Sequence, residues 1–241
     1  MNRIVKVMKY QMKDITKAII VFYLVVLLLT VFFSAITFQY TDASGSSNIS
    51  MGGFGMTTAI FIFIAGLNCF KVNFKFSRAN NVSRKTFYYG TILALLIFAV
   101  FMAFIDTLIS GILNTVLNIS YESLHEQLYQ YRSPLAEFIW SFGLYAFFVN
   151  LGWLITMIYY RSNVLMKVMV SISPIVFIML FQFMNHLTNG ILGKGVLNFF
   201  NYALGFYYNH NSMIGGVSFI IGSIFVIAFC YLLIRRAPIR D

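Results

Sequence analysis

Charged side chains are scarce in this sequence. Its 241 residues include 17 Lys and Arg and 7 Asp and Glu, and 60% of the chain is hydrophobic. Soluble domains average ~25% charged and ~45–50% apolar residues. A soluble fold of this length needs a more polar surface than these charges provide. The composition therefore excludes an ordinary soluble globular protein and indicates a membrane protein.

The residues that metal, haem and thiol chemistry require are also few. The two cysteines, Cys69 and Cys230, lie in apolar stretches and form no thiol or zinc motif. The three histidines lack the paired helical spacing of a membrane metalloprotease or a haem site. The glycine-rich run at 190–195 fails the spacing of a phosphate-binding loop. We therefore expect no catalytic residue, no metal site and no cofactor in this chain.

Long apolar runs are abundant. A helix needs ~20 mostly apolar residues to cross the ~30 Å hydrocarbon core of a bilayer. Six runs have this length, so we predict an all-α membrane fold with six transmembrane helices in a single domain, 1–241. The predicted spans are residues 18–38, 54–72, 87–117, 135–159, 168–186 and 212–234.

Basic residues alternate between the segments that connect these spans. Fifteen of the 17 Lys and Arg lie before the first span, between the second and third, between the fourth and fifth, or after the sixth. Lys and Arg gather in cytoplasmic loops, so the split predicts a multi-pass protein with both termini in the cytoplasm. The outward side carries Arg132 and Lys194 together with Asp42, Glu122, Glu126 and Glu137.

Three segments outside the spans are expected to be helical. Residues 1–17 place five cations on one helical face and apolar residues on the other, which predicts a helix lying on the membrane surface. Residues 118–133 predict a short surface helix, and Pro134 after it suits a first helical position. Residues 187–211 are too broken to span and too apolar for an open loop, which favours a re-entrant or interfacial helix.

The segment between the second and third spans, 71–86, holds five cations with aromatic residues between them. Asn80 and Asn81 suit a turn, and Ser83 can cap a helix that begins at Arg84. A segment of this kind can dock onto a soluble partner, and it is also compatible with an ordinary basic cytoplasmic loop.

The run FSRANNVSRKTFYYG at 76–90 resembles the first cytoplasmic loop of ABC-2 type (type V fold) exporter permeases, which contains a coupling helix. That family also has an N-terminal amphipathic elbow helix, six spans, cytoplasmic termini and a re-entrant piece between spans five and six. Family members often carry prolines before span six, and this chain departs from that pattern because 187–211 contains none.

The resemblance implies a half-transporter of the bacterial cytoplasmic membrane that pairs with itself or with a sister permease. ATP and Mg would be bound by two copies of a separate ATPase subunit. The residues that would contact this ATPase are Phe76, Ser77, Arg78, Asn80, Ser83, Arg84, Lys85, Arg161 and Lys167. The sparse charge in the spans favours a hydrophobic or amphipathic cargo, such as an antimicrobial peptide, a lipid or a drug. No nucleic-acid partner is expected.

Four residues in the spans are candidates for a pathway or a gate: Asp106, Asn150, Pro174 and Gln182. Asp106 is expected near the outer interface, either as a hydrated carboxylate or as part of an exit path. Pro174 should bend the fifth span, which serves either gating or packing. A proton-coupled carrier is disfavoured, because such carriers bury several ionisable groups.

A second hypothesis is a membrane sensor or assembly protein whose basic cytoplasmic loop binds a regulator or an anionic lipid. The two hypotheses differ in one simple observation. A neighbouring gene for a soluble ATPase with a Walker motif is expected only for the transporter.

Overall fold

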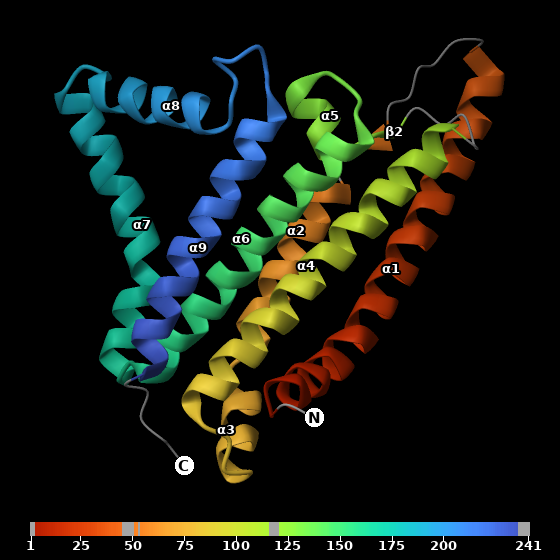
Figure 1. The fold of residues 1–241 in the computed structure, drawn as a ribbon. Helices are drawn as coiled ribbons and strands as arrows, with labels where there is room; N and C mark the ends of the chain where they lie inside the picture. Colours follow the sequence, from red (N-terminus) through yellow and green to blue (C-terminus); the bar gives the residue numbers. More distant parts are fainter. Residues whose placement is uncertain (1–2, 45–50, 53, 116–120, 236–241) are drawn as a thin grey trace.

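The computed structural model describes residues 3–44, 51–52, 54–115 and 121–235, and these residues are almost entirely helical (Figure 1). Six helices are long and apolar enough to cross a membrane, which confirms the predicted all-α membrane fold. The elements are α1 (Arg3–Ser44), β1 (Met51–Gly52), α2 (Phe54–Asn68), α3 (Lys71–Ala79), α4 (Arg84–Thr115), β2 (Tyr121–Glu122), α5 (Leu124–Tyr129), α6 (Pro134–Arg161), α7 (Val164–Leu187), α8 (Ile191–Ala203) and α9 (Ser212–Arg235).

Local sequence signals determine where several helices begin. The predicted helix start at Arg84 is confirmed, because α4 begins there and the Ser83 hydroxyl accepts the backbone N–H of Thr86 at 3.1 Å. α6 begins with Pro134, whose missing N–H would have no partner in the first turn. The predicted surface helix is α5, which follows a capping box formed by Ser123 and Glu126.

α6 is the central helix of the bundle and packs against α2, α4 and α9. Glycines make two of these contacts very close. A Cβ atom at Gly152 would clash with the backbone of Phe63 in α2, and one at Gly143 would lie 2.6 Å from the carbonyl oxygen of Gly216 in α9. Small residues allow helix backbones to approach in this way in membrane proteins. Trp153, fully buried, fills the core beside the first contact.

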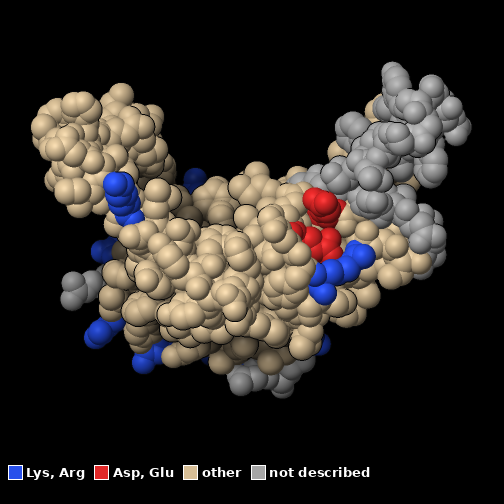
Figure 2. All heavy atoms as spheres, turned by 90° about the horizontal axis from the view of Figure 1, so that it is seen from above, with Lys and Arg blue, Asp and Glu red and all other residues tan. Residues whose placement is uncertain are grey.

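The two ends of the bundle differ in charge. One end, which we call the basic end, contains the start of α1, all of α3 and the end of α9 (Figure 1). The other end, which we call the α5 end, is formed by α5, α8 and the short parallel pair β1–β2. Figure 2 views the molecule from the α5 end, where acidic side chains gather in one patch beside basic atoms. The two ends therefore offer different surfaces to a partner.

α7 and α8 stand apart from the rest of the bundle (Figures 1 and 2). Neither helix has a buried residue. α7 contains Pro174, and α8 lies across the α5 end between α7 and α9 (Figure 1). A helix was expected within 187–211, and α8 is that helix. Its 13 residues are too few to span a bilayer.

Two expected boundaries differ from the structure. α1 is one continuous helix of 42 residues, so the predicted helix over 1–17 continues into the first span without a break, and its place on the membrane surface stays a prediction. The second span was expected to reach residue 72, but α2 ends at Asn68. The break falls at Cys69 and Phe70, because the Phe70 ring packs into an aromatic cluster at the basic end. Hydropathy alone does not show such a break.

Candidate functional site

The predicted coupling segment is anchored by an aromatic cluster. The ring of Phe74 in α3 lies 5.0 Å from that of Phe70 and 5.3 Å from that of Phe87 in α4. Tyr160 at the end of α6 lies 5.3 Å from Phe70. All four side chains are buried, so α3 is held against both α4 and α6. This fixation makes α3 a rigid extension of the bundle.

The turn between α3 and α4 is held by hydrogen bonds from its own side chains. Asn81 adopts φ 54°, a left-handed conformation that asparagine tolerates better than most residues. The Val82 N–H donates to the Ser77 carbonyl at 2.9 Å, and the Arg78 Nη1 donates to the Val82 carbonyl at 3.0 Å. The predicted turn at Asn80 and Asn81 is therefore confirmed, and Arg78 stabilises it.

Arg84 is also engaged with backbone. Its Nη1 donates to the carbonyl oxygen of Arg235, the last described residue of α9, at 2.8 Å. This bond ties the start of α4 to the end of α9. Ser77 is only 4% exposed, so it offers little surface to another protein. The predicted coupling residues that present an exposed surface on this segment are Phe76, Asn80, Ser83 and Lys85.

The first turns of α1 lie beside α3. The ring of Tyr10 stacks on that of Phe76 with centroids 4.6 Å apart and planes at 12°. A groove of about 360 Å³ between the helices is lined by Arg3, Lys6, Val7 and the turn residues of the coupling segment. Sequence reasoning treated the two segments separately and missed Tyr10. Tyr10 could have been selected from the sequence, because it is the only aromatic residue among residues 1–17.

The second predicted contact region lies where α6 ends and α7 begins. Arg161 is the last residue of α6 and is half-buried, and Lys167 is exposed in the first turn of α7. Tyr160, the neighbour of Arg161, is the residue that reaches α3, with its ring 5.8 Å from that of Phe74. The link between the two regions therefore runs through an aromatic side chain that sequence reasoning did not select.

Asp106 lies among four helices. Its carboxyl group accepts hydrogen bonds from the hydroxyl of Tyr23 in α1 at 2.8 Å and from the hydroxyl of Tyr145 in α6. Thr58 of α2 also reaches it. We call these four residues the Asp106 cluster. The Asp106 carboxyl group therefore lies between helices and bonds to protein hydroxyls. Of the two predicted settings, a hydrated carboxylate at the interface describes these contacts less well.

The other pathway candidates lie elsewhere. Asn150 in α6 is fully buried, and its Nδ2 donates to the Ser223 hydroxyl of α9 at 3.1 Å. Pro174 and Gln182 lie on α7 and are exposed. A single chain therefore does not bring the four candidates together. Asp106 and Asn150 tie helices within the bundle, whereas the two residues of α7 face away from it.

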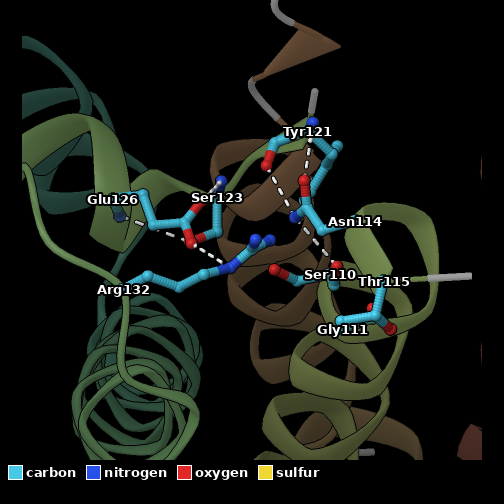
Figure 3. A network of polar contacts seen from close by, with 8 residues as sticks. All are labelled: Ser110, Gly111, Asn114, Thr115, Tyr121, Ser123, Glu126 and Arg132. Atoms are coloured by element: carbon cyan, nitrogen blue, oxygen red, sulfur yellow. Dashed lines mark hydrogen bonds and ion pairs between the residues drawn. The ribbon is translucent and has the colours of Figure 1, made fainter. Parts of the chain in front are cut away.

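A network of polar contacts holds the loops at the α5 end (Figure 3). The Asn114 side chain donates to the Tyr121 carbonyl at 2.8 Å and accepts the Tyr121 N–H at 3.0 Å, which fixes β2 against α4. The Nε of Arg132 lies 2.8 Å from Oε1 of Glu126, the glutamate of the capping box. These contacts support the structure of the loops, and they pair Glu126 with Arg132.

His125 of α5 is enclosed by aromatic rings. It is 1% exposed, and the ring centroids of Tyr129, Tyr131 and Trp140 lie 5.4, 5.3 and 6.0 Å from its own. Neither ring nitrogen has a hydrogen-bond partner among the described residues. Burial lowers the pKa of His125 to about 4, so the imidazole is neutral near pH 7.

In the part of the chain that the structure describes, no three His, Cys, Asp or Glu side chains gather as metal ligands. Both cysteines are buried. The described residues thus offer hydrogen-bonded helix contacts and a basic segment held against the bundle at one end. Comparison with protein families, with curated proteins and with solved structures finds no match to this chain.

Proposed function

We propose that this chain is the membrane subunit of an ATP-driven exporter of the ABC-2 type, located in the bacterial cytoplasmic membrane with both termini in the cytoplasm. The observation that carries the proposal is the α3–turn–α4 segment at the basic end. Separate ATPase subunits would bind this segment, hydrolyse ATP and supply the energy for transport. The chain itself would form the path through the membrane.

The segment has the two properties that force transmission requires. It is rigid, because Phe74 is buried in the aromatic cluster and Arg78 holds the turn. It is also exposed and basic, since Lys75 and Lys85 are exposed and Phe76 is 47% exposed. Charged rims and exposed aromatic anchors are typical of protein docking surfaces. A push on α3 would reach α4 and α6 through the packed rings.

The exposed helix α7 supports pairing with a second permease, either another copy or a sister chain. None of its residues is buried, although it is long and apolar enough to span the bilayer. Gln182 is exposed on this helix, and polar side chains in membrane spans usually face other protein or a cavity. A second permease against α7 would cover this side chain and close a path between two copies.

The chemistry of the described spans supports a hydrophobic or amphipathic cargo, such as a peptide, a lipid or a drug. Asp106 is engaged by tyrosine hydroxyls within the bundle, and Asn150 is bonded to Ser223. Neither lines an open polar channel in this chain. A path between two permeases would therefore be lined mainly by apolar side chains, which suit an apolar cargo.

The test takes any soluble Walker-motif ATPase encoded by a neighbouring gene and reconstitutes it with the full chain in lipid vesicles. Arg78 and Arg84 hold backbone carbonyls, so changing them would also disturb the fold. Lys75→Glu combined with Phe76→Ala alters the exposed surface instead. We expect co-purification of the ATPase to fall about tenfold or more, and ATP hydrolysis in the vesicles to fall to the rate of the ATPase alone. The reason is that Glu at position 75 would face acidic groups of a partner that binds this basic surface, and like charges at a docking surface cost several kcal/mol.

The matched control is Lys194→Glu, a charge reversal on the exposed surface of α8 at the other end of the bundle. It should leave both readings unchanged. If the double variant binds and stimulates the ATPase as well as the unaltered chain does, the docking assignment is wrong. If no neighbouring ATPase binds the unaltered chain, the exporter proposal itself fails, and the sensor or assembly role becomes the better interpretation.

A further inference from the structure

Three cations surround one pocket at the basic end. The pocket has a volume of about 430 Å³ and is lined by Arg84 and Lys85 of α4 and by Tyr231, Ile234 and Arg235 of α9. We call these five residues the anion pocket. In the described part of the chain, none of its three cations forms an ion pair. Among the described residues, no acidic side chain therefore compensates these charges.

The start of α4 adds to this positive potential, whereas the carbonyl groups at the end of α9 oppose it. Arg84 and Lys85 occupy the first turn of α4, and that turn contains no acidic residue. The start of a helix carries a partial positive charge and favours anions, so two cations there are unfavourable unless an anion binds. The carbonyl of Arg235, which could have offered negative charge from the end of α9, already accepts the Arg84 Nη1 at 2.8 Å. That bond also fixes the guanidinium at the pocket.

The surroundings of the pocket are amphipathic and lie at the end of two spanning helices. α4 begins and α9 ends here, and both are long and apolar enough to cross a bilayer. Tyr89, one turn into the span from Lys85, is 49% exposed. The ring of Tyr88 lies 5.1 Å from that of Tyr231, and its hydroxyl donates to the Ile227 carbonyl at 2.9 Å. Tyrosines at this depth are typical of the membrane–water interface.

We propose that the anion pocket binds the phosphate headgroup of an anionic phospholipid. Arg84, Lys85 and Arg235 contact the phosphate, and Tyr231 of the pocket and the exposed Tyr89 pack beside the glycerol and the first methylenes. A free phosphate ion carries the same negative charge as the headgroup, but it has no acyl chain to pack against Tyr231 and Ile234, so it should bind more weakly. The site would thereby join α4 to α9 in membranes that contain such lipids. This proposal does not depend on ATP-driven transport.

The experiment uses the full chain, purified in a non-ionic detergent and titrated with lipid while bound lipid is counted by native mass spectrometry. The probes are phosphatidylglycerol, phosphatidylcholine and the water-soluble glycerol phosphate. The variant is Lys85→Gln with Arg235→Gln. Both side chains are exposed, and the Arg84 bond to the main-chain carbonyl of Arg235 is retained. Each basic residue near a lipid surface contributes ~1 kcal/mol, so we expect phosphatidylglycerol to bind about 30-fold more weakly.

The matched control is Lys71→Gln with Lys75→Gln, which removes the same charge from exposed positions on α3 outside the pocket. It should bind phosphatidylglycerol within twofold of the unaltered chain. An equal loss of phosphatidylglycerol binding in the control would show that general surface charge holds the lipid, and it would overturn the site. Equal binding of phosphatidylcholine, or binding of glycerol phosphate as tight as that of the lipid, would also overturn it. Tryptophan fluorescence on heating checks that every variant is folded.

Discussion

Replacing Gly152 with alanine should destabilise the protein, because this glycine lies where α6 meets α2. Its missing side chain leaves room for the backbone of α2. A Cβ at this position would clash with the carbonyl oxygen of Phe63 and lie 3.1 Å from the amide nitrogen of Leu67. Both are backbone atoms and cannot rotate away. The two helices would have to separate, and a gap of ~0.5–1 Å forfeits about a quarter to a half of each contact's attraction.

The expected change in the free energy of unfolding follows from two opposing contributions. Forcing extra atoms into a filled contact costs ~1–3 kcal/mol. Because the neighbours of Gly152 are backbone atoms that cannot rotate away, we expect a cost at the upper end of this range. Alanine returns ~1 kcal/mol through its higher helix propensity. The net loss should be about 2 kcal/mol, which is about a 30-fold change in the unfolding equilibrium.

The assay is denaturant unfolding in mild detergent, followed by tryptophan fluorescence. Trp153 is next to Gly152 and is fully buried, so its emission reports on this contact. Gly111→Ala in α4 is the matched control, since nothing lies within 4 Å of a Cβ there. It should stabilise by ~0.5–1 kcal/mol. If both substitutions shift stability in the same direction, the close approach of α2 and α6 is refuted.

Three further predictions concern polar groups. Tyr145→Phe removes a hydroxyl donor from Asp106 and should cost ~0.6–1.7 kcal/mol, the range for polar contacts between membrane helices, in the same unfolding assay. His125 has a folded pKa of about 4, below its ordinary value, so α5 should lose stability as pH falls from ~6.5 to 4. The protection factors of the α5 amides, which correct for the pH dependence of intrinsic exchange, should fall over that window, and His125→Phe should remove this decrease. Ser123→Ala removes half of the capping box with Glu126 and should cost ~1 kcal/mol, seen as faster exchange in α5 at neutral pH.

The number of long helices and the starts of two of them followed from the sequence, for physical reasons that act along the chain. Six apolar runs predicted six spanning helices because the bilayer core requires that length. Helix starts at Arg84 and Pro134 followed from capping and from the missing N–H of proline. The turn at Asn81 followed from the tolerance of asparagine for positive φ. Each of these signals involves residues close together in sequence.

Contacts between distant segments depended on the tertiary structure. Arg78 and Arg84 stay predicted partner contacts, and only the tertiary structure shows that both also donate to backbone carbonyls, with the acceptor for Arg84 151 residues away. For Asp106 the sequence left a hydrated carboxylate and an exit path open, because a sequence does not show that Tyr23 and Tyr145 converge on it. Apolar patterns cannot distinguish the buried α6 from α7, which has no buried residue. Lipid-facing and protein-facing surfaces are equally apolar in a membrane, so only packing decides which helix lies inside.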